Sequence, residues 1–148
     1  MPPALIHLAS DFVKTHALVA LLLSFGATAV FAQRDYSKVE ITATPVAKNI
    51  YMLQGAGGNI GALIGPEGNL IVDDQFAPLA PKIDAALQKL NPGKLKFVLN
   101  THHHGDHTGG NATFGAKDAL IIAQSNVRKR LAAETEPKKE GLPVITFE

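Results

Sequence analysis

Residues 100–111 read N-T-H-H-H-G-D-H-T-G-G-N and place four candidate metal ligands within six positions. His102, His104, Asp106 and His107 form an H-x-H-x-D-H array in a chain that contains only six histidines. Imidazole and carboxylate groups suit zinc, iron or manganese better than they suit soft metals. The array therefore predicts a metal site.

The spacing of the array predicts how its members divide between ions. In an extended segment residues i and i+2 point to the same side, so His102 and His104 can bind one ion together. Gly105 lets the chain turn and brings Asp106 and His107 toward the same cavity. Because adjacent residues rarely serve one ion, this pair suggests a second ion about 3.5–4 Å from the first. Such ions lower the pKa of bound water from about 15.7 toward about 7.

The residues around the array have simpler interpretations. The alternative to a metal site is a solvated histidine loop, which four ligand-type residues in this order disfavour. His103 points away from the array in an extended chain, so we expect it to pack or to hydrogen-bond a ligand. Asn111-Ala112-Thr113 matches a glycosylation sequon, but a turn after the metal loop is the expected role.

The run T-H-H-H-G-D-H-T-G-G-N resembles the signature of the metallo-β-lactamase superfamily, which includes glyoxalase II-type thioesterases. The resemblance implies that His102 and His104 bind a first metal and that Asp106 and His107 bind a second. It also implies a catalytic role for Asp106, which would orient the attacking water. The implied cofactor is zinc, with two ions in the intact site and iron or manganese as alternatives.

The resemblance spans residues 46–147 and covers only the first half of the family's αββα sandwich. A complete domain supplies further metal ligands from its second half, and no histidine follows His107 here. We therefore expect an α/β fold that forms the N-terminal portion of a longer hydrolase. The first metal would lack a protein ligand, so the sequence leaves open whether these 148 residues are active alone.

Apolar periodicity predicts a mixed order of strands and helices. The strand at 69–72, the helix at 79–90 and the strand at 95–99 form a β-α-β unit, which favours parallel strands with a right-handed crossover. The turn at 65–68 makes an antiparallel pair of the strands before it and after it. The predicted elements are strands at 44–53, 60–64, 69–72, 95–99, 119–123 and 144–147, and helices at 79–90 and 125–133.

Carboxylates and imidazoles follow the two parallel strands directly. Open α/β sheets bind ligands at the carboxyl ends of such strands, and these ends meet at one rim. Residues 70–73, Leu-Ile-Val-Asp, resemble the family's first motif, which implies that Asp73 supports the metal loop by hydrogen bonding. We expect Asp74 to face solvent or to lead into the helix.

Three glycines at positions 55, 57 and 58 do not complete a dinucleotide-binding fingerprint. Ile60 stands where the third glycine should fall, and a strand rather than a helix follows. We expect these glycines to form a mobile hairpin tip that lies over the site.

Composition bounds the class of protein. The chain has 148 residues, a net charge of +1 and no cysteine. This length allows one globular domain, and the charge argues against nucleic acid as an obligate partner. The lack of cysteine excludes both a disulfide framework and a thiolate metal ligand.

An apolar, charge-free stretch at residues 17–32 ends in Val30-Phe31-Ala32, which resembles a cleavage site. It predicts a signal peptide at 1–32, a partial catalytic domain at 33–148, and export to the periplasm or the medium. An uncleaved anchor is the alternative, although the stretch is short for about 30 Å of hydrocarbon. No stable membrane span is expected after cleavage.

Three functions remain open from the sequence. The leading one is a dizinc hydrolase that uses metal-bound hydroxide on the ester, thioester or amide carbonyl of a small-molecule substrate. The second is a mononuclear iron dioxygenase of sulfur compounds. The third is a non-catalytic metal-binding half-module, completed by a partner or by self-association through an exposed sheet edge.

Overall fold

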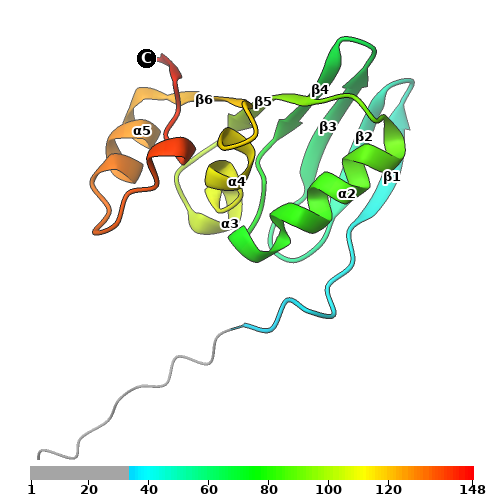
Figure 1. The fold of residues 1–148 in the computed structure, drawn as a ribbon, viewed down its shortest axis with the longest axis horizontal. Helices are drawn as coiled ribbons and strands as arrows, with labels where there is room; N and C mark the ends of the chain where they lie inside the picture. Colours follow the sequence, from blue (N-terminus) through cyan, green and yellow to red (C-terminus); the bar gives the residue numbers. More distant parts are fainter. Residues whose placement is uncertain (1–33) are drawn as a thin grey trace, which may run out of the picture. The chain divides into compact units, whose positions relative to one another are not determined.

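The computed structural model describes residues 34–148, and the signal peptide predicted at 1–32 lies outside them. Residues Asp35–Glu148 form one unit built on a seven-stranded sheet with the strand order β1-β2-β3-β4-β5-β6-β7 (Figure 1). Among the described helices, none has the length and apolarity to cross a membrane.

The sheet is antiparallel in its first part and parallel in its second. Strands β1 to β4 pair antiparallel, and β4 to β7 pair parallel. The strands are β1 (Thr42–Ala47), β2 (Ile50–Gln54), β3 (Ile60–Gly65), β4 (Gly68–Val72), β5 (Leu95–Asn100), β6 (Leu120–Gln124) and β7 (Ile145–Phe147). The helices are η1 (Ala77–Leu79), α2 (Ala80–Leu90), α3 (Gly105–Thr108), α4 (Asn111–Gly115), α5 (Ser125–Ala132) and η2 (Lys139–Gly141).

The single strand predicted at 44–53 was wrong, because the segment forms β1 and β2. Lys48 and Asn49 make a two-residue turn between them, and Ala47 pairs with Ile50 across that turn. Two-residue hairpin loops favour Asn-Gly or Asp-Gly. Lys-Asn is a weaker turn signal, so the sequence pattern does not reveal this hairpin. The other predicted strands and helices are confirmed within about two residues at their ends.

The predicted β-α-β unit is confirmed, and it determines where the site lies. Strands β4 and β5 are parallel neighbours joined through η1 and α2, with Val72 aligned with Leu99. The backbone N–H of Asp73 extends this pairing by donating to the carbonyl of Leu99 at 2.8 Å. The residues after both strands therefore meet at one rim.

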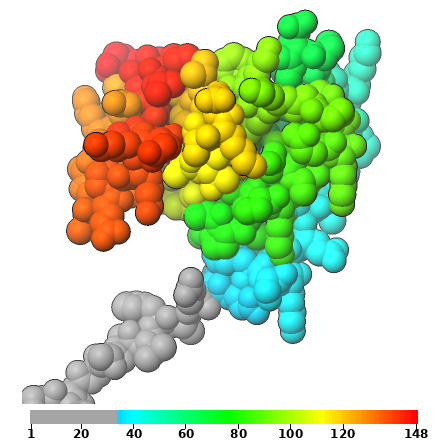
Figure 2. All heavy atoms as spheres, in the orientation of Figure 1, coloured from blue at the N-terminus to red at the C-terminus, as the bar shows by residue number. Residues whose placement is uncertain are grey.

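The helices bury one face of the sheet. Ile71 of β4, Val98 of β5 and Ile121 of β6 lie in one buried cluster with Ile83 and Leu87 of α2. A smaller cluster joins β6 to α5. In the view of Figure 2 the atoms of α2 and α4, in green and yellow, pack side by side over this core. This buried core therefore supports the edge of the sheet at which β4 and β5 end.

Candidate metal centre

The histidine motif begins where β5 ends and runs into a single turn of helix. His104 precedes α3, and its carbonyl accepts hydrogen bonds from the backbone N–H groups of His107 and Thr108 at 2.9 and 3.1 Å. Gly105 begins this helix. The chain therefore reverses after His104 as expected, but it does so as a helical turn that carries Asp106 and His107.

Asp73 supports this motif through three hydrogen bonds, as predicted. Its Oδ1 accepts from the backbone N–H of Thr101 at 2.8 Å, and its Oδ2 accepts from the Thr101 hydroxyl at 2.8 Å. Oδ2 also lies 2.8 Å from Nδ1 of His107. Because the carboxylate accepts, Nδ1 of His107 carries the proton and Nε2 keeps its lone pair. That Nε2 lies 3.5 Å from Oδ2 of Asp106.

The same carboxylate also orders His102, through Thr101. The Thr101 hydroxyl lies 3.0 Å from Nδ1 of His102. Since its one proton goes to Asp73, the hydroxyl accepts from His102, which leaves Nε2 of His102 free as well. The ring centroid of His102 lies 4.7 Å from that of His104 and 4.0 Å from that of His107. Three imidazole rings therefore lie close together, and two of them are linked by hydrogen bonds to the buried carboxylate of Asp73.

The imidazole and carboxylate groups of these side chains are of the chemical types that bind divalent cations. A ligating imidazole usually donates its other ring N–H to a carboxylate or other acceptor, which is the arrangement of His107 with Asp73. Within residues 34–148, however, no three histidine or acidic side chains are arranged to hold a single ion. The described residues therefore offer candidate ligands without a closed coordination shell.

The prediction that Asp74 faces solvent or leads into the helix was wrong on the first count. The left-handed backbone of Asp73, with φ of 64°, turns the chain inward, and Asp74 is fully buried. Its Oδ1 accepts from the backbone N–H of Gly110 at 2.9 Å, and its own N–H donates to the carbonyl of His107 at 3.1 Å. Burial raises the pKa of Asp74 to about 8, against the lowering effect of the Gly110 bond.

Gln75 joins the glycine-rich hairpin at residues 55–58 to the loop that carries the histidine motif, residues 102–107. Its backbone is also left-handed, its side chain is buried, and its Nε2 donates to the carbonyl of Gly58. A Cβ added at Gly57 would lie 3.3 Å from Cβ of Asp106, and one at Gly58 would lie 3.2 Å from Cε1 of His107. The hairpin therefore lies against the site, as predicted. The positive φ of Gly57 favours glycine there, and a Cβ at Gly58 would crowd the ring of His107.

Two buried asparagines hold the motif from the other side. Nδ2 of Asn100 donates to the carbonyl of His107 at 3.1 Å, and Nδ2 of Asn111 donates to Oδ1 of Asn100 at 2.9 Å. Asn111 also donates to the carbonyl of Gly141 at 3.0 Å. Asn111 thus begins α4 as a buried cross-link, which corrects the expected role in a turn. Its buried amide nitrogen, with both of these bonds, is not presented for glycosylation.

His103 stands apart from the hydrogen-bond network of Asp73. Its ring contacts those of its two neighbours edge-on, with centroids 6.5 Å from His102 and 4.7 Å from His104. Partial desolvation and then the positive charge of Arg130 lower the pKa of His103, which favours the neutral ring. This agrees with the prediction that His103 packs beside the array.

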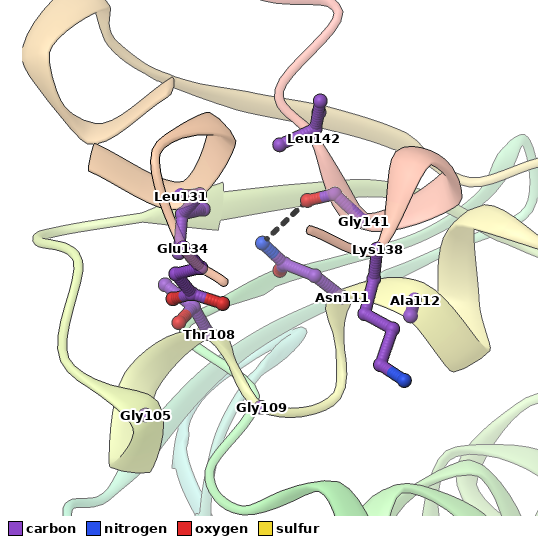
Figure 3. A pocket seen from close by; sticks show the side chains of 10 residues that line it. All are labelled: Gly105, Thr108, Gly109, Asn111, Ala112, Leu131, Glu134, Lys138, Gly141 and Leu142. Carbon is purple, nitrogen blue, oxygen red and sulfur yellow. Dashed lines mark hydrogen bonds between the residues drawn. The ribbon is translucent and has the colours of Figure 1, made fainter. Parts of the chain in front are cut away.

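A pocket of about 210 Å³ lies beside the metal loop (Figure 3). In this view Thr108, Leu131 and Glu134 lie on one side of the pocket, and Asn111, Lys138 and Gly141 lie on the other. None of the four predicted metal ligands lines this pocket. The hollow is therefore adjacent to the motif without opening onto its donor atoms.

Comparison with known proteins identifies the family. The model of the metallo-beta-lactamase superfamily matches residues 43–124, which is more than half of the chain. The chain belongs to the metallo-beta-lactamase superfamily. The match includes Asp73 and the whole H-x-H-x-D-H array, so the family rests on the residues that form the rim.

The curated relatives are hydrolases. Hydroxyacylglutathione hydrolase of Methylococcus capsulatus is 29% identical over 106 residues, covering 70% of this chain and 37% of the relative. The enzyme of the same name from Rhodopseudomonas palustris is 33% identical over 97 residues, covering 65% and 38%. The chain thus spans less than two fifths of these relatives, in agreement with a resemblance to the first half of the fold.

Solved structures share the architecture. The Rm3 metallo-beta-lactamase has a TM-score of 0.53 and 31% identity, covering 60% of this chain and 35% of its own. BJP-1, a subclass B3 metallo-beta-lactamase of Bradyrhizobium japonicum, has a TM-score of 0.58 and 22% identity, covering 77% and 46%. The predicted α/β fold of this superfamily is confirmed.

Proposed function

We propose that this chain forms the metal-binding part of a dizinc hydrolase that cleaves a thioester, ester or amide. One observation carries the proposal: Asp73 holds His107 directly, and His102 through Thr101, so that Nε2 of each ring is free. Imidazoles in this state are ready ligands for zinc. His102 and His104 would hold one ion, and Asp106 and His107 the other.

The chain's own residues supply binding and orientation. When bound, the metal supplies an activated water at neutral pH and polarises the scissile carbonyl. Asp106 is partly exposed beside Nε2 of His107, where its carboxylate can accept a hydrogen bond from that water and orient it. The Gly57–Gly58 backbone lies against Asp106 and His107, and so excludes bulk solvent from one side of the pair.

A thioester is the substrate class that we place first. The two curated relatives are named as hydrolases of hydroxyacylglutathione, an acylated thiol. The part of them that this chain matches includes the histidine motif. Esters and amides follow, because the same polarised carbonyl serves all three classes.

A non-catalytic metal-binding half-module is the second candidate. It is favoured because no three donors within the described residues are arranged around one ion. A first metal held by His102 and His104 alone would bind weakly until other ligands completed its shell. The chain would then bind metal without turnover. An iron dioxygenase of sulfur compounds differs from both candidates by its single iron ion and its consumption of oxygen.

The test combines metal analysis with a substrate panel. The purified full chain is loaded with zinc, iron or manganese, its metal content is measured, and hydrolysis of thioesters, esters and amides is followed with and without chelator. We expect a zinc content that falls in His104→Ala and is retained in His103→Ala, and chelator-sensitive thioester hydrolysis. Hydrolysis that is indifferent to chelator, or equal metal content in both variants, contradicts the proposal. Zinc binding without turnover supports the half-module instead.

A further inference from the structure

The segment before β1, residues 35–41, belongs to no helix or strand, yet it packs against the core. Tyr36, Val39 and Ile41 are half-buried and lie against the main buried cluster, whereas the residues between them are exposed. The backbone N–H of Val39 donates to the carbonyl of Tyr36 at 3.1 Å, which closes one turn. A segment outside the sheet needs other partners for its remaining carbonyl groups.

Lys82 of α2 is such a partner. Its Nζ donates to the carbonyls of Tyr36 at 3.0 Å, of Ser37 at 2.7 Å and of Val39 at 2.7 Å. An ammonium group has three protons, so this segment takes its full set of hydrogen bonds. Bonds from a charged donor are also stronger than neutral ones. Lys82 therefore fastens the segment, drawn in cyan in Figure 1, to α2 across 43 to 46 positions of sequence.

Lys82 holds these carbonyls from a position that disfavours a cation. It lies in the first turn of α2, which begins at Ala80. The N-terminal end of a helix carries positive partial charge, which repels a positive side chain. Lys89, in the last turn of the same helix, occupies the favourable end and is exposed. The three carbonyl oxygens therefore offset an unfavourable place for the charge of Lys82.

The fastened segment contacts the glycine-rich hairpin. The Tyr36 ring packs on the ring of Phe76, with centroids 5.1 Å apart. Phe76 in turn lies against Gly57, where an added Cβ would be 3.1 Å from Cε2 of the ring. Ile41 lies closer still to Gly55, where an added Cβ would be 2.5 Å from Cδ1 of Ile41. The segment thus supports the hairpin both directly and through Phe76.

The other side of the hairpin contacts two candidate metal ligands. The added Cβ at Gly57 would lie 3.3 Å from Cβ of Asp106, and one at Gly58 would lie 3.2 Å from Cε1 of His107. Three glycines among its four residues give the hairpin little rigidity of its own. Its position beside the ligands therefore depends on the contacts on both of its sides.

We propose that Lys82 is a positioning residue for the metal centre, because it holds residues 35–41 where they keep the hairpin closed against the candidate ligands. Lys82 acts through the segment and the hairpin, not by touching a ligand. Without its three bonds the segment and the hairpin loosen together, and Asp106 and His107 lose a contact that limits their rotamers. The inference rests on the proposed function only in this consequence for metal binding.

Backbone order parameters from nuclear magnetic resonance relaxation test the first step, on the metal-free full chain. Rigid backbone gives values of about 0.85, and flexible backbone gives values below about 0.6. Lys82→Met removes the ammonium and keeps an apolar stem, so we expect the amides of residues 55–58 to fall from the rigid to the flexible range. Amides within β5 should stay rigid, because a folded protein that is only less stable keeps the order of its core.

Two further variants and a control make the test specific. Tyr36→Ala keeps the backbone carbonyls that Lys82 binds and removes the ring from Phe76, so it should loosen the hairpin in the same direction and serves if Lys82→Met does not fold. Lys82→Arg retains a charged donor and should restore part of the order. Lys89→Met makes the same chemical change as Lys82→Met at the exposed end of α2 and should leave the hairpin rigid.

Zinc titration tests the second step. Zinc affinity should fall roughly three- to tenfold in Lys82→Met, which is less than for the loss of a direct partner of a ligand. Lys89→Met should bind zinc as the wild type does.

Three results separate the possible failures. Order parameters that stay at the wild-type level in both Lys82→Met and Tyr36→Ala would overturn the proposal, whatever the chain binds. A loosened hairpin with unchanged zinc affinity would also overturn it, because the hairpin would then not position the ligands. A wild-type chain that binds no zinc would contradict the proposed function instead, and the order parameters would still decide whether Lys82 holds the hairpin.

Discussion

The two sides of the loop that carries the histidine motif differ in burial and in hydrogen bonding. Its base, toward the sheet, is a buried network in which Asp73, Asp74 and Asn111 each accept or donate hydrogen bonds to the loop. Its rim carries His102, His104 and Asp106, which are exposed or half-buried. The base thus fixes the path of the backbone, and the rim presents the candidate ligands. This difference implies that stability and metal affinity can be changed separately.

Asp73→Asn should have the largest effect, because Asp73 belongs to both sides. Asparagine can keep the bond from Thr101 N–H, but its NH₂ group then faces the Thr101 hydroxyl and Nδ1 of His107. We expect unfolding to become easier by about 2–3 kcal/mol, as for the loss of hydrogen bonds to a buried charge. Zinc affinity should fall about 10–100-fold, because the proton on His107 moves to Nε2.

Chemical denaturation and zinc titration measure the two effects of Asp73→Asn. Glu136→Gln, a charge removal at an exposed loop residue, is the control and should change neither quantity. If Asp73→Asn changed stability alone, the proposed control of the histidine tautomers would be wrong.

Asn111→Ala should separate the base from the rim. It removes the bonds to Asn100 and Gly141 inside a buried site, at a cost of about 1–3 kcal/mol. Since Asn111 contacts no predicted ligand side chain, we expect less than about a tenfold change in zinc affinity once the protein is folded. Denaturation and zinc titration below the melting transition provide the comparison. An affinity loss as large as that of Asp73→Asn would show that the two sides are not separable.

The sequence predicts the rim better than the base, for a physical reason. Candidate ligands such as His102 and Asp106 belong to residue types that are seldom clustered at such a spacing, so a local pattern is enough to propose them. The β-α-β unit was likewise predictable, because apolar periods and turn residues indicate its elements. Its parallel strands then brought Asp73 to the motif, as the sequence predicted.

The base depends on contacts between distant segments, which no local pattern reveals. Asp74 is buried because Asp73 takes a left-handed conformation that a sequence does not display. Gln75 reaches the Gly58 carbonyl across 17 positions, and Asn111 reaches Gly141 across 30. The available signal was three consecutive polar residues directly after a buried strand. Such a run is unusual enough to suggest that they turn inward together.

Asp74 should make the base sensitive to pH. Burial raises the folded-state pKa of Asp74 to about 8 from an ordinary value of 3.8, so the folded protein holds a proton that the unfolded chain releases. The stabilisation that comes from this bound proton is therefore fully present below pH 3.8 and is lost as the pH rises toward 8. In metal-free protein we expect the free energy of unfolding to fall by up to about 1.4 kcal/mol per pH unit within this window.

Asp74→Asn tests this effect, because an amide does not titrate. Denaturant unfolding between pH 5 and about 8 should show a much flatter profile for the variant than for the wild type. The same slope in both proteins would assign the pH dependence to another group.

His104→Ala should have the smallest effect on stability. The side chain is exposed, and the one structural role of this residue is its carbonyl, which accepts from the backbone of His107 and Thr108 and is kept by alanine. We expect a change within about 0.5 kcal/mol in metal-free protein, as for other surface substitutions. Zinc affinity should nevertheless fall at least tenfold, because a proposed ligand is lost. His103→Ala, at the adjacent position, should change neither quantity. A shared loss of affinity in both variants would mean that the exposed rim binds metal as a diffuse histidine cluster, and the distinction between a fixed base and a ligand-bearing rim would then fail at the rim.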